Sequence, residues 1–585
     1  MPSRGAGFRI NGARDLSPEV GRGSLRPVQS GPKNLDEFVL LPQPRKIVRG
    51  CGCCGADELR TLRDGSLPAQ SYRLAIRPDG IEMAAADDAG AHYAAMTLRQ
   101  LRRVCDGPLP CGTIEDWPDF PVRGIMLDIS RCKVPKMETL FRLVDEFSEW
   151  KINRLELYTE HTFSYRNHRE VWQHADPMTA EQIRELDNFC RARFVELVPN
   201  QNCFGHLARW LTHPRYRDLA ETPNGHTAWG EFRNYPCSLN PLDPRSIELV
   251  AEMLSELLPN FSSRNVNVGC DETVDLGQGR SKSECERIGK GRVYLDFLLK
   301  IYELTKRQGR TMHFWGDIIL HHPELISELP RDAVALVWGY EAAHPFDKEC
   351  AAFAKSGLPF FVCPGTSSWN SLVGRTANML GNIRNAAENG IKFSARGFIT
   401  TDWGDNGHWQ TLPFSYPGFA TGAAMSWCVE SNRDADFAVQ LDAHVFRDTA
   451  HVTGAAVLAL GDVYRQLSSQ RANGSNLFWF LRGDDIAILA DKTSASELNG
   501  IRDALREISA QLRRSEIRRD DAAQIQSEIA LGISMADTGC RRAAGEKETS
   551  DDLQKLIAAM RAVWLFRNRA GGCDESMEPL RRRLA

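Results

Sequence analysis

The 585-residue sequence lacks the features that mark several classes of protein. It contains no run of about 18 apolar residues, which argues against a membrane-spanning helix. Its formal net charge is only −4, so no basic face for nucleic acid is expected. The first residues, from Met1 to Gly23, contain arginine and glycine but no apolar signal-peptide core. The sequence alone therefore predicts a cytoplasmic protein with neither a membrane nor a nucleic-acid partner.

Metal binding is not indicated either, although the chain has sixteen cysteines. In a reducing compartment scattered cysteines are mostly free and pack as small hydrophobic residues. Cys51, Cys53 and Cys54 lie close together, but no second ligand pair follows at zinc-finger spacing. We therefore predict no metal and no cofactor.

The length predicts two to four domains. Residues 1–34 are polar and are expected to form a poorly ordered lead-in. Residues 35–115 have the pattern of a small α/β domain, in which Tyr72–Ile76 and Ile81–Ala84 form a hairpin and Asp88 caps the helix that follows. Residues 433–585 are charged and helix-prone, which predicts a helical C-terminal domain.

Residues 116–432 alternate short apolar runs with amphipathic helical segments. Eight such strands over this length predict an α/β fold, a (β/α)8 TIM barrel. A doubly wound open sheet is the alternative, but no glycine-rich phosphate loop follows a strand. The predicted strands are Gly124–Leu127, Arg154–Tyr158, Phe194–Val198, Val266–Val268, Thr311–Trp315, Val334–Trp338, Phe360–Cys363 and Phe398–Thr401.

Two adjacent carboxylates, Asp271 and Glu272, follow the fourth predicted strand after Gly269 and Cys270. Catalytic groups of parallel barrels lie where strands end. Two carboxylates in one site can hold different protonation states, as cleavage of a glycosidic bond requires. An isolated Asp-Glu pair is more often a solvated loop. Cys270 has no visible base to activate it and is interpreted as wall packing.

Other strand ends carry side chains that suit a sugar. Indole faces cover the apolar face of a pyranose, while amides and carboxylates take its hydroxyl groups. One tryptophan near a strand end is more often core, but four in this position favour a binding site. A lone histidine there is more often structural. The ends of the strands together form the mouth of the barrel. The residues expected at this mouth, besides the carboxylate pair, are Asn202, His206, Trp315, Trp338, Trp369, Trp403 and Asp405.

From Leu35 to Asn432 the chain resembles glycoside hydrolase family 20, the β-N-acetylhexosaminidases. The stretch from Asp116 to Arg131 looks like the family's first barrel strand, and Val268 to Glu272 is similar to its glycine-then-Asp-Glu signature. Gly397 to Asp405 resembles its eighth strand, with Asp405 in place of glutamate.

The resemblance implies a role for each matching residue. Arg123 would hold the C3 and C4 hydroxyl groups of the terminal sugar, and Asp405 a distal hydroxyl. Asp271 would orient and polarise the 2-acetamido group, and Glu272 would be the general acid/base. The pocket walls would be Trp315, Trp338 and Trp403.

This chain departs from the family around the pair. Asn202 stands where an acidic residue is usual. After its second strand the family usually has a histidine pair and acidic residues, and the segment from Arg154 to His161 stands there instead. Trp369 and Asn370 match the seventh strand end only loosely. The leading prediction is a retaining exo-β-N-acetylhexosaminidase that acts on N-acetylhexosamine-containing glycans. The alternatives are a non-catalytic sugar-binding homologue and a barrel glycosidase with endo action or another 2-acetamido sugar.

Overall fold

The computed structural model describes residues 34–56, 58–483 and 490–584. The lead-in predicted for residues 1–34 thus lies outside the described residues, apart from Asn34. Within the described ranges, no helix combines the length and the apolar composition that crossing a bilayer requires.

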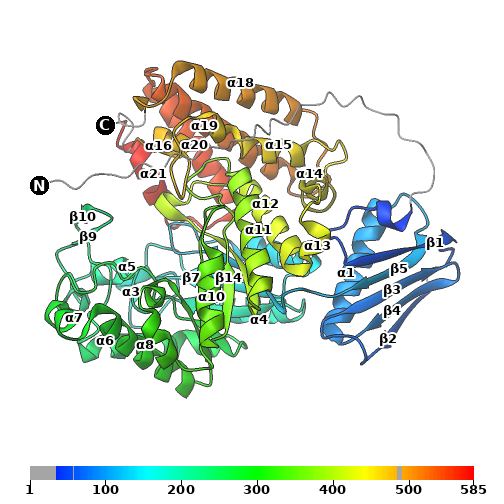
Figure 1. Cartoon of the computed structure of the whole chain (residues 1–585). Helices are drawn as coiled ribbons and strands as arrows, with labels where there is room; N and C mark the ends of the chain where they lie inside the picture. The colour runs from blue at the N-terminus through cyan, green and yellow to red at the C-terminus, as the bar shows by residue number, and fades with distance from the viewer. Residues whose placement is uncertain (1–33, 57, 484–489, 585) are drawn as a thin grey trace, which may run out of the picture. The chain divides into compact units, whose positions relative to one another are not determined.

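The small N-terminal domain is a five-stranded sheet in the order β1-β5-β3-β4-β2, with helix α1 against it (Figure 1). The predicted hairpin is confirmed, because β3 and β4 pair antiparallel. The predicted cap is wrong by one residue: the side chain of Asp87, not Asp88, accepts the hydrogen bond from the Gly90 amide. The elements are β1 Lys46–Cys53, β2 Leu59–Arg63, β3 Tyr72–Arg77, β4 Gly80–Ala85, α1 Asp88–Val104 and β5 Pro110–Asp116.

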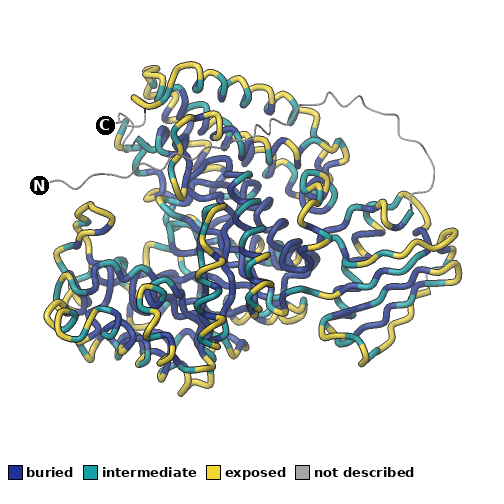
Figure 2. The backbone as a smooth tube through the Cα atoms, viewed as in Figure 1, coloured by how far each residue is buried: buried dark blue, intermediate teal, exposed yellow. Residues whose placement is uncertain are grey.

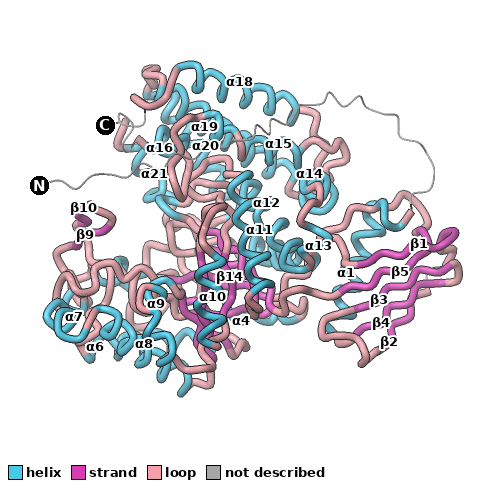
Figure 3. Tube along the Cα trace, viewed as in Figure 1, coloured by secondary structure: helices cyan, strands magenta, loops and turns pink. Residues whose placement is uncertain are grey.

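Eight parallel strands close into a barrel, as the sequence predicted (Figure 3). The third predicted strand is displaced. Phe194 adopts a left-handed backbone conformation (φ 56°) and is still in the turn, while the strand continues through Pro199, a residue that usually signals a strand end. The strands are β6 Val122–Asp128, β7 Arg154–Thr159, β8 Glu196–Gln201, β11 Asn265–Asn267, β12 Thr311–Trp315, β13 Val334–Trp338, β14 Phe360–Cys363 and β15 Gly397–Asp402.

Amphipathic helices connect these strands. The helix after the last strand, α12 (Leu412–Trp427), is different, because all its residues from Pro413 onward are buried (Figure 2). It packs against α19 (Ala522–Ala543) of the C-terminal helices as well as against the barrel. The main connecting helices are α2 Met137–Glu149, α4 Ala180–Arg191, α6 Pro244–Leu257, α8 Lys290–Arg307, α10 Phe346–Ser356 and α11 Thr376–Lys392.

The loops of the barrel contain short elements, including a two-stranded antiparallel ribbon of β9 (His226–Ala228) and β10 (Glu231–Arg233). Short α-helices in these loops are α3 Arg169–Trp172, α5 Ala208–Leu211, α7 Lys282–Ile288 and α9 Asp317–Leu320, and α13 Val429–Asn432 and α14 Phe437–Gln440 follow the barrel. The C-terminal region is helical, as predicted. Its helices are α15 Thr453–Leu460, α16 Asn476–Arg482, α18 Ala495–Leu512, α19 Ala522–Ala543, α20 Ser550–Arg567 and α21 Cys573–Arg581.

Candidate active site

The turn after β11 presents Asp271 and Glu272 at the mouth of the barrel. Glycine is required at two positions around it. Gly269 has φ 66°, and a Cβ atom there would lie 2.5 Å from the side chain of Asn202. A Cβ atom on Gly205 would lie 2.5 Å from the carbonyl oxygen of Asp271. Both glycines thus permit the close approach that brings the third and fourth strand ends together.

Two residues of neighbouring elements fix this turn. The hydroxyl of Tyr294, on α8, donates to the carbonyl oxygen of Cys270 at 2.9 Å. The amide of Glu272 donates to Oδ2 of Asp317 at 3.1 Å. Cys270 and Glu272 both adopt positive φ, 68° and 44°, which is unfavourable for residues with a side chain. The surrounding bonds hold this strained backbone, as is common at functional sites.

Asp271 is the inner member of the pair, and its two oxygen atoms have different partners. Oδ1 accepts a hydrogen bond from Nδ2 of Asn202 at 2.8 Å, and Oδ2 lies 3.2 Å from Nε2 of His206. Burial alone would raise the pKa of Asp271, but His206, Asn202 and Arg131 together lower it. Asp271 is therefore ionised and held in one orientation.

His206 connects the two carboxylates. Its Nε2 also lies 3.4 Å from Oε2 of Glu272. Burial would lower the pKa of His206, yet the carboxylates of Asp271 and Glu272 raise it well above its usual value. The Glu272 side chain is 33% exposed, compared with 9% for Asp271. Glu272 thus faces the open side of the site, where a departing group or a water molecule can reach it.

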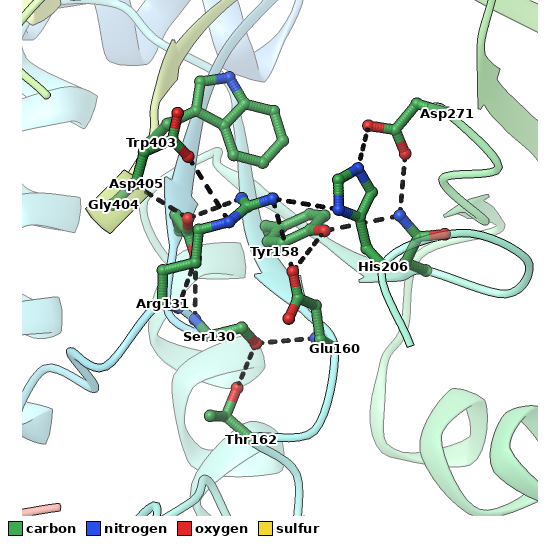
Figure 4. A network of polar contacts seen from close by, with 12 residues as sticks. Ser130, Arg131, Tyr158, Glu160, Thr162, His206, Asp271, Trp403, Gly404 and Asp405 are labelled. Atoms are coloured by element: carbon green, nitrogen blue, oxygen red, sulfur yellow. Dashed lines mark hydrogen bonds and ion pairs between the residues drawn. The ribbon is translucent and has the colours of Figure 1, made fainter. Parts of the chain in front are cut away.

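Arg131 is the central cation of the mouth (Figure 4). Its Nη1 donates to Asp128 at 2.9 Å, and its other nitrogen atoms lie 3.5 Å from Glu160 and from Asp405. The guanidinium also lies over the ring of Trp403, 4.9 Å from the ring centroid. These carboxylates and ring contacts fix a planar donor group beside the Asp271–Glu272 pair.

Aromatic rings enclose a pocket of about 420 Å³ above the pair. The indole NH of Trp403 donates to the hydroxyl of Tyr340 at 2.7 Å, and Tyr340 stacks on Trp338 with ring centroids 5.2 Å apart. The volume suits one monosaccharide unit more than an extended chain. The pocket is lined by Arg131, His206, Trp229, Asp271, Glu272, Trp315, Trp338, Gly339, Tyr340, Glu341, His344, Trp403, Asp405, Ala472 and Asn473.

The structure corrects the place predicted for Arg123. This residue lies near the start of β6, whereas the mouth is formed where the strands end, and it is fully buried. Its guanidinium donates to the Lys151 and Phe120 carbonyl oxygens, to the Gln70 side chain and to the Tyr93 hydroxyl. Arg123 therefore joins the barrel to the small domain, and Arg131 is the arginine of the mouth.

Two further predicted residues support the pocket without lining it. Asn202 is buried and acts through its bond to Asp271. Trp369 is also buried; its ring packs edge-on against Tyr340 at 5.0 Å, and its indole NH donates to Asn473. The other predicted residues, His206, Trp315, Trp338, Trp403 and Asp405, line the pocket together with the carboxylate pair.

The prediction missed several pocket residues. Asn473 belongs to the C-terminal region, for which the sequence predicted only a helical domain, and its backbone amide donates to Oε1 of Glu341 at 2.7 Å. Trp229 lies between β9 and β10 and is 71% exposed. Tyr340 lies two residues after the predicted Trp338, so the strand-end rule could have found it. For Asn473 and Trp229 the sequence carries no comparable signal.

We predict that Asp317→Asn will make stability less dependent on pH. Burial and the Asp271 charge raise the pKa of Asp317 from 3.8 to about 8. Between these values the folded chain holds a proton that the unfolded chain releases, so wild-type stability falls as pH rises. Asparagine keeps an acceptor for the Glu272 amide but cannot ionise. Thermal unfolding should show a Tm advantage for the variant that grows by several degrees from pH 4 to pH 8; parallel curves would contradict the prediction.

A closed parallel barrel with adjacent carboxylates and an aromatic pocket at its strand ends has the make-up of a carbohydrate-active barrel protein. Two family models match the chain in succession. Residues 28–117 match glycosyl hydrolase family 20, domain 2, and residues 120–369 match the catalytic domain of the same family. The chain belongs to glycosyl hydrolase family 20, as the resemblance predicted.

Relatives of this chain include hexosaminidases. The chain is 27% identical over 323 residues to a beta-hexosaminidase of Akkermansia muciniphila, covering 49% of this chain and 64% of that protein. It is 25% identical over 232 residues to human hexosaminidase D, covering 38% of this chain and 46% of that protein. The chain thus spans less than two thirds of the length of these relatives.

Solved structures of low sequence identity share the fold. The chitobiase of Flavobacterium johnsoniae has a TM-score of 0.58 at 15% sequence identity. The match covers 93% of this chain and 99% of the chitobiase chain. An exo beta-N-acetylglucosaminidase from Vibrio harveyi has a TM-score of 0.57 at 17% identity, over 72% of this chain and 78% of its own.

Proposed function

We propose that this chain is a retaining exo-β-N-acetylhexosaminidase that removes a terminal β-linked N-acetylhexosamine from a glycan or glycoside. The observation that carries the proposal is the arrangement of Asp271 and Glu272. One carboxylate is deep, ionised and fixed by Asn202 and His206, while the other is exposed to the pocket. The similarity to a beta-hexosaminidase and to hexosaminidase D supports the same substrate class.

The two carboxylates fit different parts of a substrate-assisted reaction. The acetamido oxygen forms a bond to the anomeric carbon while the glycosidic bond breaks, and Glu272 gives its proton to the leaving oxygen. The acetamido NH donates to Asp271, whose charge stabilises the oxazolinium-like intermediate. Glu272 then takes a proton from water, which attacks the anomeric carbon and restores the acetamide with retained configuration.

The geometry of Asp271 leaves room for this contact. Each carboxylate oxygen can accept about two hydrogen bonds; Asn202 uses one position on Oδ1, and His206 is the ion-pair partner beside Oδ2. Asn202, which stands where the family usually has an acidic residue, therefore still orients Asp271. Trp315, Trp338 and Trp403 offer faces to the sugar ring, and Asp405 can accept from a hydroxyl group.

The direct test is hydrolysis of 4-nitrophenyl N-acetyl-β-glucosaminide and N-acetyl-β-galactosaminide, followed by NMR of the first-formed anomer. Release of the β-anomer is expected. Release of the α-anomer, or no turnover of either substrate at high protein concentration, would overturn the proposal.

We predict that substitutions of Arg123, near the start of β6, and of Arg131, after its end, will have different effects on activity and stability. Arg131→Gln removes a charged donor from the pocket and should lower kcat/KM on the order of 100-fold. Arg123→Gln removes buried hydrogen bonds away from the pocket, so it should lower Tm while kcat/KM stays within about 3-fold. Steady-state kinetics and thermal unfolding of both variants check this. The opposite pattern would restore Arg123 as the substrate-binding residue.

A further inference from the structure

A second cluster of ligand-type side chains lies outside the pocket. His168 precedes the short helix α3, and Glu252 and Glu256 lie one turn apart on α6. One ligand atom from each lies within 4.8 Å of the others, and in the described part of the chain no other group of His, Cys, Asp and Glu meets this condition. The two segments are far apart in the sequence, which is why ligand spacing did not reveal them.

The tautomer of His168 follows from its neighbours. Its Nδ1 lies 2.6 Å from the hydroxyl oxygen of Tyr216, and that hydroxyl lies 2.9 Å from Oε1 of Glu170. Glu170 can only accept, so the Tyr216 hydroxyl donates its proton to it and accepts from Nδ1–H. The proton of the neutral imidazole is therefore on Nδ1, and Nε2 carries a lone pair. Metal-ligating histidines are oriented in this way by a bond from their other nitrogen.

The lone pair of Nε2 faces a carboxylate. His168 is 1% exposed, and Nε2 has no hydrogen-bond partner within the described parts of the chain, although Oε1 of Glu252 is only 3.3 Å away. Two lone pairs at this distance repel unless a cation lies between them. Two ligands about 2.0–2.1 Å from a tetrahedral zinc ion are themselves about 3.3 Å apart. The observed separation matches that spacing.

The carboxylates are already fixed by the loop that carries His168. Oε1 of Glu252 is 3.2 Å from the amide nitrogen of the Asn167 side chain, and Oε2 of Glu256 accepts from the Arg166 amide at 2.9 Å. Oε2 of Glu256 also accepts from Nε of Arg166 at 3.4 Å. Oε1 of Glu252, the oxygen that faces Nε2 of His168, keeps a second acceptor position beside its bond to Asn167, and Oε1 of Glu256 has neither of the Arg166 bonds. The site is thus preorganised by three consecutive loop residues against one helix.

We propose that His168, Glu252 and Glu256 bind a divalent cation of the zinc type. One imidazole and two carboxylates suit zinc, whereas Ca²⁺ and Mg²⁺ prefer oxygen ligands alone. The cation would hold the loop after β7 against α6. His168 packs on Trp210 with ring centroids 5.1 Å apart, and the Trp210 indole donates to the carbonyl oxygen of Glu160 at 2.7 Å. Because Glu160 lies beside Arg131, the cation would also steady that part of the mouth.

Zinc binding to the full-length, chelator-treated chain tests the proposal. The exposed Cys51 and Cys53 are first alkylated, because thiols also bind zinc. Calorimetric titration with ZnCl₂ is expected to show one equivalent bound and a Tm raised by several degrees, and an equal concentration of Ca²⁺ should not compete. Glu252→Gln and Glu256→Gln should each weaken zinc binding by about 100-fold or more.

Glu248→Gln is the matched control, because Glu248 lies on α6 one turn before Glu252 and is exposed. It should bind zinc as the wild type does, and circular dichroism of all three variants checks that they fold. The proposal is overturned if the alkylated wild type binds no zinc, or if both ligand variants bind it with unchanged affinity. In the first case a proton, and not a metal ion, would join His168 to Glu252.

Discussion

Glu272→Gln should lower kcat/KM by about 10³-fold on N-acetyl-β-hexosaminides with poor leaving groups. Glutamine has nearly the same shape as glutamate and keeps the hydrogen bond from the backbone amide of residue 272 to Asp317. Its side chain, however, cannot transfer a proton. The loss should shrink when the leaving group needs no proton. A 4-nitrophenyl glycoside should therefore lose much less activity in bond cleavage than a methyl glycoside.

The measurement compares kcat/KM for these two substrates in the wild type and the variant. Glu324→Gln, an exposed surface substitution, controls for the loss of one charge. Added azide should restore turnover in Glu272→Gln, because this anion can open the intermediate without a general base. Equal losses on both substrates, or no loss on either, would show that Glu272 is not the proton donor.

Several strand positions could be predicted because those strands are short apolar runs buried on both faces. Thr311–Trp315, Val334–Trp338 and Phe360–Cys363 were predicted with the bounds that the structure has. The error at the third strand came from local signals. Phe194 has high strand propensity and Pro199 low, yet packing against the neighbouring strands decides which residues pair.

The candidate site could be predicted only where a residue lies at or just after the end of its strand. Trp403 directly follows β15, Trp338 is the last residue of β13, and Asp271 and Glu272 lie in the turn after β11, so all four were found from the position of a strand end. Arg123 did not meet this condition, since it stands near the start of β6, and strict use of strand direction would have favoured Arg131. Family resemblance supplied the arginine's role but attached it to the wrong end of the strand.

Residues that reach the site from distant segments could not be predicted. Asn473 comes from the C-terminal region, and its backbone and side chain bond Glu341 and Trp369. The zinc-type cluster likewise joins a loop residue to a helix through tertiary packing. Sequence periodicity reports which face of an element is buried, but it does not report which distant segment covers that face.

Asp271→Asn should lower kcat/KM for N-acetyl-β-hexosaminides by about 10²- to 10³-fold. The substitution removes the charge that stabilises the oxazolinium-like intermediate. It also places an amide between two donors, Asn202 and His206, so one of them loses its acceptor whichever way the new side chain turns. The loss of kcat/KM should therefore be larger than the loss caused by removing one negative charge elsewhere. Asp218→Asn, a substitution at an exposed residue, is the control for removal of a charge.

The affinity for a thiazoline mimic of the intermediate separates this role from general damage to the pocket. Wild type should bind the mimic tightly, because the Asp271 carboxylate meets its ring nitrogen, and Asp271→Asn should bind it at least about 100-fold more weakly. Arg131 and the tryptophans that line the pocket are unchanged in this variant, so we expect the affinity for the plain product sugar to change much less. Unchanged affinity for the mimic would mean that Asp271 does not contact the acetamido group, and the substrate's own oxygen would then lack the partner that makes it a nucleophile.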